Sequence, residues 1–460
     1  MTEQVVIERM SYGAQGIGRL SSGKTVFVDG AVPQDTVSVV IDQEKSSFAR
    51  GHVDQVLEAS PLRVPCTCPH GALCGGCPWQ ALSYQAQLDA KGENVRSALI
   101  RTAGMDPEAV GQLVRPVAGS KRQWGYRNKL ELACFSDDRG RLQLGFHAQG
   151  GNPSPAPDTC PVAVKALQKA PKALRGSLRF AQGADDLGIF RVGVRSSLRT
   201  HSTEVALWTP AGAFPRVSVA KTLQSACSPT SVVRVLADPG KARKVKKVEV
   251  LSGKGFWAEE LCGTRFMTSA PAFFQVNTAQ AERLVAEVMR GIAGRSPEPF
   301  EGGAAAYVDQ VVEGFALEDL RVADLYSGGG TFSIPLALAG ADVTAVESAG
   351  PSVRDLRRNA ENAGAYVEVI GDDAALALPT LGHLDALVVD PPRAGLAKGV
   401  VESIAAATPD RVAYVSCDPQ TWARDVVRFQ ENGYELTYVQ PVDLFPQTYH
   451  CEVVSLFRRR

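Results

Sequence analysis

A cysteine and a glutamate near the end of the chain have the types and positions needed for covalent chemistry. Cys417 follows the apolar run Tyr414-Val-Ser and precedes Asp418-Pro419, which predicts a strand that ends where a helix begins. A helix N-terminus favours a thiolate and lowers a cysteine pKa, although Asp418 beside it acts in the opposite direction. A lone cysteine is usually a small buried apolar residue. The position of Cys417 at a strand end favours a nucleophile instead.

Glu452 could supply the base that such a nucleophile needs. It precedes the apolar run 453–457, which we expect to form a strand beside that of Cys417. Burial there would raise the pKa of the Glu452 carboxyl toward that of a working base. Taken alone, Glu452 is equally well explained as an acid at a strand edge, and His450 as a structural residue.

A glycine-rich turn indicates a nucleotide-like ligand. Gly328 lies in the run DLYSGGGT, between a strand pattern and a helix pattern, and its glycines let the backbone approach a ligand closely. Glu347 ends the next strand pattern, 17 positions after Gly330, where a carboxylate can accept hydrogen bonds from ribose hydroxyls. Ser333 breaks the G-x-G-x-x-G pattern of nicotinamide enzymes. The turn therefore predicts another adenosine-containing ligand.

Four of the ten cysteines fall within twelve positions. Cys68, Cys74 and Cys77 are spaced C-x5-C-x2-C, and Cys160 lies 83 positions beyond Cys77. Structural zinc sites more often have two C-x2-C arms, and only one is present. Three close thiolates and a distant fourth suit a [4Fe–4S] cluster, with zinc as the alternative and Cys66 as a possible substitute ligand.

Composition describes an ordinary globular protein with a polarised charge distribution. The 460 residues are 45% hydrophobic and 21% charged, and no apolar run reaches the roughly 18 residues that span a bilayer. No signal-peptide pattern is visible, so we expect a cytoplasmic protein without a membrane partner. The formal net charge is zero, but basic residues outnumber acidic ones more than two to one between 115 and 254. That segment could attract nucleic acid, or could be an ordinary basic surface.

The elements that must position these residues divide into three predicted domains. Residues 1–60 contain short alternating strands with glycine turns, typical of a small barrel of the oligonucleotide-binding kind. Residues 61–280 are mainly strand-like, with helices expected at Tyr84–Thr102 and Val162–Leu174. From 281, a helix over Ala281–Ile292 is followed by repeated strand–helix units, which predict an open α/β parallel sheet.

Ligands in such sheets bind beyond the carboxyl ends of the strands, which is where these motifs lie. Asp390 belongs to the same set. It follows the apolar run LDALVV and precedes two prolines, which force it out of helical geometry. Its carboxylate could face the pocket, or the segment could be a plain tight turn.

Taken in order along the chain, these motifs resemble the uracil-C5 RNA methyltransferase family, S-adenosylmethionine-dependent enzymes that form 5-methyluridine. The N-terminal barrel is similar to a TRAM domain. The remaining matching motifs are CPHGALCGGC, CPVA, YRNK, PAFFQVN, DLYSGGGTF, VESAGPSVRDLRRNAENA, GDDAA, VVDPPRAGL, YVSCDP and FPQTYHCEVVSLF. The resemblance implies a Rossmann-like class I methyltransferase domain, a TRAM-like barrel and a central, mainly-β iron–sulfur domain.

The resemblance also implies roles for individual residues. Cys417 matches the nucleophile and Glu452 the proton-abstracting base. The cluster ligands would be Cys68, Cys74, Cys77 and Cys160, and the cofactor-binding residues would be Gln275, Tyr326, Gly328, Glu347, Asp373 and Asp390. Thr331 stands where some members have Asn, and the pair Asp372-Asp373 leaves the acid on the adenine side ambiguous.

The implied reaction is methylation of uracil C5 in RNA. The oligomeric state cannot be read from the sequence, and a monomer is assumed. Cluster-bearing members mostly act on large-subunit ribosomal RNA, so 23S ribosomal RNA is favoured over tRNA. A non-catalytic RNA-binding or ribosome-assembly factor of the same fold is the alternative, and it would not bind S-adenosylmethionine. An amino-methylating enzyme for adenine is less compatible with the sequence, because Arg393 stands where its aromatic residue would follow Asp-Pro-Pro.

Overall fold

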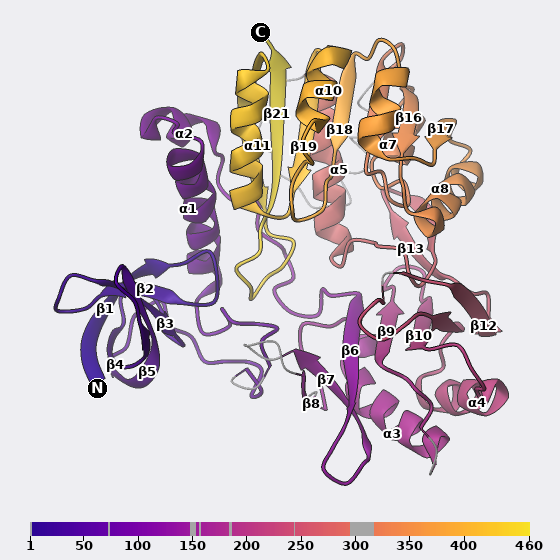
Figure 1. Ribbon diagram of the computed structural model, residues 1–460, viewed down its shortest axis with the longest axis horizontal. Helices are drawn as coiled ribbons and strands as arrows, with labels where there is room; N and C mark the ends of the chain where they lie inside the picture. Colours follow the sequence, from indigo (N-terminus) through magenta and orange to yellow (C-terminus); the bar gives the residue numbers. More distant parts are fainter. Residues whose placement is uncertain are drawn as a thin grey trace.

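The computed structural model describes residues 2–71, 74–147, 153–155, 158–183, 186–242, 244–294 and 317–460. In this part of the chain the strands form a closed barrel, two seven-stranded sheets and one two-stranded hairpin. The barrel and the first seven-stranded sheet, here called the central sheet, lie side by side below the C-terminal sheet (Figure 1). Over the same residues, no helix combines the length and the apolar character that a membrane span requires.

The N-terminal strands close into a barrel because alternate residues are apolar and point inward. Val5, Val26 and Val37 are among the buried residues of its core. The strand order is β1-β2-β3-β5-β4, and β4 pairs back onto β1. Its strands are β1 (Thr2–Met10), β2 (Gly16–Arg19), β3 (Thr25–Asp29), β4 (Thr36–Glu44) and β5 (Phe48–Glu58). The predicted barrel is confirmed.

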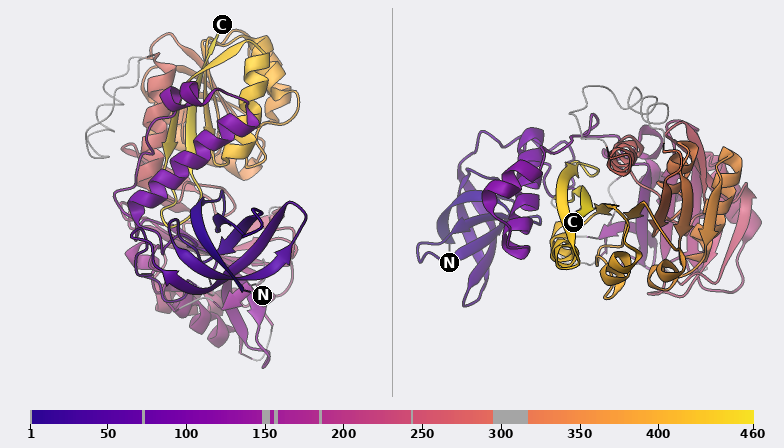
Figure 2. Two further views of the ribbon diagram at one scale, coloured as in Figure 1. Left: turned by 90° about the vertical axis from the view of Figure 1, so that its left-hand side faces the viewer. Right: turned by 90° about the horizontal axis from the view of Figure 1, so that it is seen from above.

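Two helices connect the barrel to the rest of the molecule. They are α1 (Tyr84–Thr102), which has the predicted bounds, and α2 (Pro107–Leu113). Both contribute buried residues to the core on one face of the C-terminal sheet. Seen from above, α1 lies between the barrel and the C-terminal strands (Figure 2).

The central sheet has the strand order β12-β11-β10-β9-β6-β7-β8, and only β10 and β11 are parallel. Its strands are β6 (Lys129–Ser136), β7 (Leu142–His147), β8 (Pro153–Pro155), β9 (Arg191–Ser196), β10 (Thr203–Thr209), β11 (Ser231–Leu236) and β12 (Lys247–Gly253). The helices α3 (Ala170–Gln182) and α4 (Arg216–Cys227) share a core with it. The hairpin of β13 (Trp257–Leu261) and β14 (Thr264–Thr268) follows.

The helix expected over Val162–Leu174 is wrong. A 3-10 turn at Lys165–Leu167 comes first, and α3 begins only at Ala170. Pro171 lies in the first turn of α3, where its missing N–H costs nothing. Leu174 and Leu178, one turn apart, then face the core.

The C-terminal sheet has the strand order β17-β16-β15-β18-β19-β21-β20. Its strands are β15 (Arg321–Leu325), β16 (Asp342–Val346), β17 (Val367–Ile370), β18 (Ala386–Val389), β19 (Arg411–Ser416), β20 (Tyr434–Val442) and β21 (Glu452–Arg459). The first five neighbours are parallel, whereas β21 runs antiparallel to β19 and β20.

Helices cover both faces of this sheet, so its inner strand β18 is apolar and buried along its whole length. One face packs on α5 (Thr278–Ile292), α7 (Ser333–Leu338) and α8 (Gly350–Ala363). The other packs on α1, α9 (Ala374–Ala377), α10 (Val400–Ala407) and α11 (Pro419–Glu431), with a 3-10 turn at Leu378–Thr380. The predicted α/β sheet is confirmed, although α5 starts three residues earlier than expected.

Candidate active site

The ends of neighbouring strands bring the predicted nucleophile and base together. Cys417 directly follows β19, and Glu452 is the first residue of β21. These strands pair with Ser416 opposite Val453, so Cys417 and Glu452 stand at facing positions of the same ladder. Asp390 follows β18, the parallel neighbour of β19. The strand of Glu452 therefore lies beside that of Cys417, as the sequence predicted.

The acids at this edge have raised pKa values. Glu452 is 3% exposed, and burial together with the nearby Asp390 raises the pKa of its carboxyl to about 8, against the opposing effect of Arg393. Burial and the neighbouring Asp324 raise the pKa of Asp390 to about 7. Neither acid forms an ion pair with a residue that the structure describes. Both can therefore gain or lose a proton near neutral pH.

The expected lowering of the Cys417 pKa is wrong. Burial, followed by the carboxylates of Glu452 and Asp390, raises the pKa of the thiol to about 12. Asp418 also explains why the N-terminus of α11 does not lower the pKa of the Cys417 thiol. As the N-cap of α11, its carboxylate accepts hydrogen bonds from the N–H groups of Gln420 (2.9 Å) and Thr421 (3.2 Å). The helix N-terminus is thus occupied by an acid beside the thiol.

Arg393 is a cation that the sequence analysis did not assign to the site. Its charge acts on Cys417 and Glu452, favouring their ionised forms. Its Nη2 lies 3.5 Å from His450 Nε2. Burial and Arg393 lower the pKa of His450 to about 3, so the imidazole is neutral. The run Asp-Pro-Pro-Arg could have indicated Arg393, because it places the guanidinium three residues from Asp390.

Residues of α1 hold the loop that precedes Glu452. Lys91 and Asp443, both without exposed side-chain surface, form an ion pair at 2.5 Å, and Lys91 also donates to the carbonyl of Phe445. Gln87 accepts from the N–H of Gln447 at 2.9 Å. These buried contacts fix the loop, because breaking one would leave a charge or an amide unpaired. The loop in turn sets the position of Glu452.

The barrel reaches the same loop through Tyr12, on the turn between β1 and β2. The Tyr12 ring meets that of Tyr449 edge to face, with centroids 5.8 Å apart. Trp79 Nε1 donates to the carbonyl of Gly13 at 2.9 Å and holds the turn. Burial, Asp418 and Cys417 together raise the pKa of the Tyr12 hydroxyl. Nothing in the sequence pattern around Tyr12 indicates that this residue lies near Cys417 and Asp418.

Hydrogen bonds hold the glycine-rich turn at Gly328 against the Glu347 carboxylate, next to this edge of the sheet. The Glu347 carboxylate accepts from the N–H of Gly328 at 2.9 Å and of Ala349 at 2.6 Å. Gly328 has φ +56° and the preceding Tyr326 has φ +63°, a left-handed conformation that is unfavourable for tyrosine. Such strain persists where the surroundings enforce it, and it is typical of ligand sites.

The described buried oxygens that have no hydrogen-bond partner include one of Gln275, a predicted cofactor-binding residue, and one of Asp324. Gln275 is 5% exposed and its Oε1 is unpartnered, while its backbone carbonyl accepts from Asn128 at 3.0 Å. Asp324 Oδ1, at the end of β15, is likewise unpartnered, and burial raises the pKa of this carboxyl to about 7. Buried polar atoms normally have partners, so these positions fit a ligand that donates hydrogen bonds.

The two candidate acids after β17 differ in what they contact. Asp373 is the N-cap of α9 and accepts from Ala375 N at 2.9 Å. Its charge also acts on the Tyr326 hydroxyl, where after burial it is the largest contribution to a raised pKa. Asp372 accepts from Asp373 N at 2.7 Å. Of these two acids, Asp373 is the one whose charge acts on Tyr326, which is also a predicted site residue.

The four predicted ligand cysteines gather at one place. Cys68, Cys74, Cys77 and Cys160 line a common cavity of about 20 Å³, whereas Cys66 is exposed and does not line it. Burial raises the pKa of Cys77 to about 12 and of Cys160 to about 11. Across the residues that the structure describes, no group of three or more His, Cys, Asp or Glu side chains has the arrangement of a metal site.

Known proteins resemble this chain along its whole length. A TRAM domain model matches residues 2–53, and a tRNA (uracil-5-)-methyltransferase model matches residues 380–460. An uncharacterized RNA methyltransferase of Gloeobacter violaceus is 35% identical over 474 residues, covering 100% of this chain and 96% of that protein. The 23S rRNA (uracil(1939)-C(5))-methyltransferase of Shewanella amazonensis is 30% identical over 463 residues, covering 98% and 94%.

A solved structure agrees in fold along the whole chain. The crystal structure of Pyrococcus abyssi tRNA (uracil-54, C5)-methyltransferase in complex with S-adenosyl-L-homocysteine has a TM-score of 0.72 and 25% identity, covering 99% of this chain and 100% of that one. Together with the full-length relatives and the two matching models, it identifies the family. The chain belongs to the RNA uracil-C5 methyltransferase family and is an S-adenosylmethionine-dependent RNA uracil-5-methyltransferase with an N-terminal TRAM domain.

Proposed function

We propose that Cys417 and Glu452 carry out the methylation through a covalent bond between enzyme and RNA. The observation that carries this proposal is the pairing of β19 with β21, which sets the two residues at facing positions. Uracil C5 is a weak nucleophile, and covalent addition divides one difficult step into easier ones. A carboxyl whose pKa is raised to about 8 is suited to take up a proton near neutral pH.

The steps balance as follows. The Cys417 thiol loses its proton to solvent, and the resulting thiolate adds to uracil C6 and forms an S–C6 bond, which makes C5 an enolate carbon. C5 attacks the sulfonium methyl group, so that a C5–CH₃ bond forms and S-adenosylhomocysteine leaves. Glu452 accepts the C5 proton, the C5=C6 double bond returns and the S–C6 bond breaks. Arg393 favours the ionised forms of both residues.

We further propose where the methyl donor binds. S-adenosylmethionine supplies the methyl group, and its ribose hydroxyls and amino group are the donors that the unpartnered oxygens require. Glu347, held by the N–H groups of Gly328 and Ala349, would accept from the ribose. The proposed binding residues are Gln275, Tyr326, Gly328, Glu347, Asp373 and Asp390.

The catalytic proposal is tested with labelled S-adenosylmethionine and unmodified cellular RNA. The Cys417→Ala variant should form no 5-methyluridine, because no other thiol stands at the end of β19. Cys227→Ala, a half-buried cysteine at the end of α4, is the matched control and should keep full activity. Unchanged 5-methyluridine formation by Cys417→Ala would refute the covalent mechanism.

We propose that the four cysteines of the cavity hold a [4Fe–4S] cluster, with zinc as the alternative. Support comes from the spacing of the cysteines and from their convergence on one cavity, whose lining includes no carboxylate or histidine. The methylation needs no electron, so the cluster would be structural. A brown anaerobic preparation absorbing near ~400 nm is expected, whereas a colourless preparation that contains zinc would support the alternative.

We propose 23S ribosomal RNA as the substrate, in preference to tRNA. Of the relatives above, the one named for 23S ribosomal RNA is 30% identical and the one named for tRNA is 25% identical, and both align over nearly the whole chain. Transcripts of 23S ribosomal RNA and of a tRNA pool, offered separately to the purified enzyme, distinguish the two. Methylation confined to the tRNA pool would overturn this choice.

A further inference from the structure

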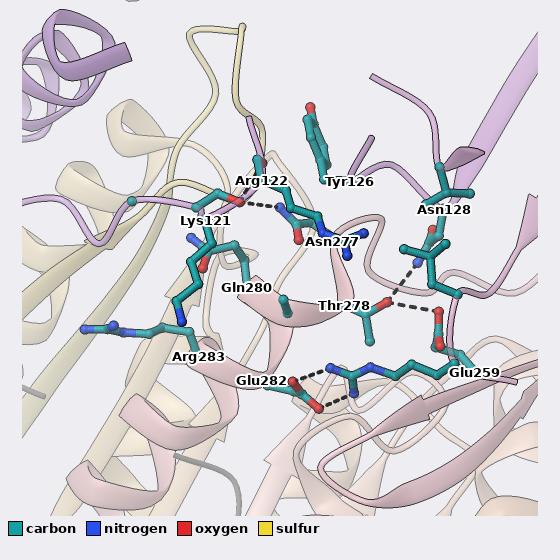
Figure 3. Close-up of a pocket in the computed structure, with 16 residues that line it drawn as sticks. Lys121, Arg122, Tyr126, Asn128, Glu259, Asn277, Thr278, Gln280, Glu282 and Arg283 are labelled. Carbon is teal, nitrogen blue, oxygen red and sulfur yellow. Dashed lines mark hydrogen bonds and ion pairs between the residues drawn. The ribbon is translucent and has the colours of Figure 1, made fainter. Parts of the chain in front are cut away.

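A cavity of about 440 Å³ lies apart from the proposed catalytic residues. Its walls come from the loop 119–122, from the central region of the chain and from the first turn of α5 (Figure 3). Cys417, Glu452 and Asp390 do not line it. The volume is within the range of small-ligand sites and is sufficient for one nucleotide.

The cavity carries uncompensated positive charge. Lys121 and Arg122 form no ion pair or side-chain hydrogen bond with any residue that the structure describes. In Figure 3, Arg122 lies in the upper part of the view, Lys121 at the left, and the two acids of the lining in the lower part. One of these acids, Glu282, is neutralised by Arg199, with Nη2 and Oε2 2.7 Å apart. The other, Glu259, accepts from the hydroxyls of Ser197 at 2.6 Å and Thr278 at 3.0 Å. Both acids are thus bonded within the protein, and the free charge in the cavity is cationic.

Another wall is apolar. Leu198 is 44% exposed and belongs to the lining, as does Val164, which is 1% exposed. Cations on one side and an exposed aliphatic surface on another suit an anionic ligand that also has a flat apolar part. A nucleotide of single-stranded RNA has this combination, because its phosphate is anionic and every base has a face that packs on apolar side chains.

Hydrogen bonds connect the cavity walls to the loop that precedes Glu452. Asn277 Nδ2 donates to the carbonyl of Leu444 at 3.2 Å, and Gln280 Nε2 donates to that of Asp443 at 2.9 Å. The Tyr126 hydroxyl, also in the lining, donates to the carbonyl of Pro446 at 3.0 Å. This loop therefore contacts residues of the cavity wall and also leads into Glu452, so a single RNA strand could occupy both regions.

We propose that this cavity binds a nucleotide of the RNA substrate other than the target uridine, on the same strand. Lys121 and Arg122 contact its phosphate and Leu198 contacts its base. The inference rests on RNA being the substrate of the proposed reaction. It assigns the cavity to substrate affinity, and it gives Lys121 and Arg122 no part in the chemistry.

The test measures RNA binding in a Cys417→Ala background, which does not depend on the reaction. The probe is ribosomal RNA from cells that lack this enzyme, bound to filters over a range of NaCl concentrations. The Lys121→Ala/Arg122→Ala variant should bind about tenfold more weakly. Its plot of log affinity against log salt should be shallower by about 0.7, because the loss of one phosphate contact on a single strand removes about 0.7.

The matched control is Lys221→Ala/Lys254→Ala, which removes the same charge from exposed positions of the same basic segment that do not line the cavity. If both double variants lose affinity equally, the attraction is a general one and the cavity assignment is wrong. A Leu198→Asp variant, changed at an exposed position, should weaken binding about fivefold, and unchanged binding would remove the base from the proposal.

Two further measurements separate the possible outcomes. With Cys417 intact, Lys121→Ala/Arg122→Ala should raise the KM for RNA about tenfold with kcat within twofold, and a loss confined to kcat would contradict the proposal. Free UMP at millimolar concentration should not compete with RNA, and effective competition would assign the cavity to free nucleotides. If Cys417 proves dispensable for methylation, the proposed mechanism fails while the binding comparison still stands.

Discussion

Two glutamates in this chain have opposite protonation behaviour. Glu131 on β6 lies 2.6 Å from Lys129 and also pairs with Arg191, so that its pKa falls to about 2 although burial acts in the opposite direction. Glu452 on β21 has no ion pair among the described residues, and burial raises its pKa to about 8. Lys129 itself is buried beside Arg195 and its pKa falls to about 8, so the Glu131 pair is still ionised near neutral pH.

The comparison shows that cationic partners can outweigh the effect of partial burial on the pKa of a carboxyl group. The central sheet supplies cations within contact distance of Glu131, and its carboxylate stays ionised. At the active edge, Asp324, Asp390 and Glu452 influence one another without forming an ion pair. Buried carboxyl groups without a cationic partner lower the stability of the fold. They can, however, accept a proton at the pH at which the enzyme works.

The largest expected effect comes from removing the base. Glu452→Gln should lower 5-methyluridine formation by about 10²- to 10⁴-fold, the usual contribution of a general base. Because the C5 proton then remains, the enzyme–RNA adduct should accumulate and migrate as a slower band in a denaturing gel. Glu131→Gln, the same substitution at the paired glutamate, should leave kcat within about twofold. If both variants lose activity equally, the contrast between the two sites has no catalytic meaning.

Much of the active edge could be predicted because strand periodicity is local. The apolar runs before Cys417 and after Glu452 indicate strands, and strand ends in an α/β sheet gather at one edge. The pKa of Cys417 could not be predicted from the sequence in the same way. That value depends on Glu452 and Asp390, which reach the thiol only through the fold.

Contacts between distant segments account for the rest of what sequence analysis missed. Tyr12 lies far along the chain from Cys417, and its place depends on how the barrel docks against Trp79 and Tyr449. The cavity of Figure 3 likewise combines the loop 119–122 with Leu198 and α5. The late start of α3 was missed for a different reason, because the apolar spacing before Pro171 also fits a helix.

The pH dependence of the reaction gives the next largest effect. The base must be ionised and the Glu452 pKa is about 8, so ionisation of Glu452 should raise kcat/KM close to tenfold per pH unit up to about pH 8. Ionisation of the Cys417 thiol, with a pKa of about 12, adds a further rise that continues above pH 8. Asp390 is one cause of this raised pKa, and Asp390→Asn should move the rise to lower pH. The measurement is initial rates of methyl transfer between pH 6 and 9. A rate independent of pH over this range would contradict the assignment of Glu452 as base.

Ionisation of Glu452 should lower the stability of the fold, although the same ionisation should raise activity. With its folded pKa raised above the unfolded value near 4.5, the carboxyl lowers stability increasingly as pH rises from about 4.5 to about 8. Glu452→Gln removes this penalty, and above pH 8 it should stabilise the fold by a few kcal/mol, at about 1.4 kcal/mol per pKa unit. Thermal unfolding at pH 5 and pH 8.5 measures the difference, which should be small at pH 5. Destabilisation at pH 8.5 would show that Glu452 has a partner.

The smallest effect is expected at the paired glutamate, with the opposite sign. Because its folded pKa is lowered, Glu131 contributes stability that is present above about pH 4.5 and lost as pH falls toward 2. Its side chain is 37% exposed, so solvent screening limits the contribution to about 1 kcal/mol. Glu131→Gln should therefore lower the unfolding temperature by a few degrees at pH 7 and by less at pH 3. An equal loss at both values would mean that Glu131 contributes packing and not charge, and the contrast with Glu452 would then rest on burial alone.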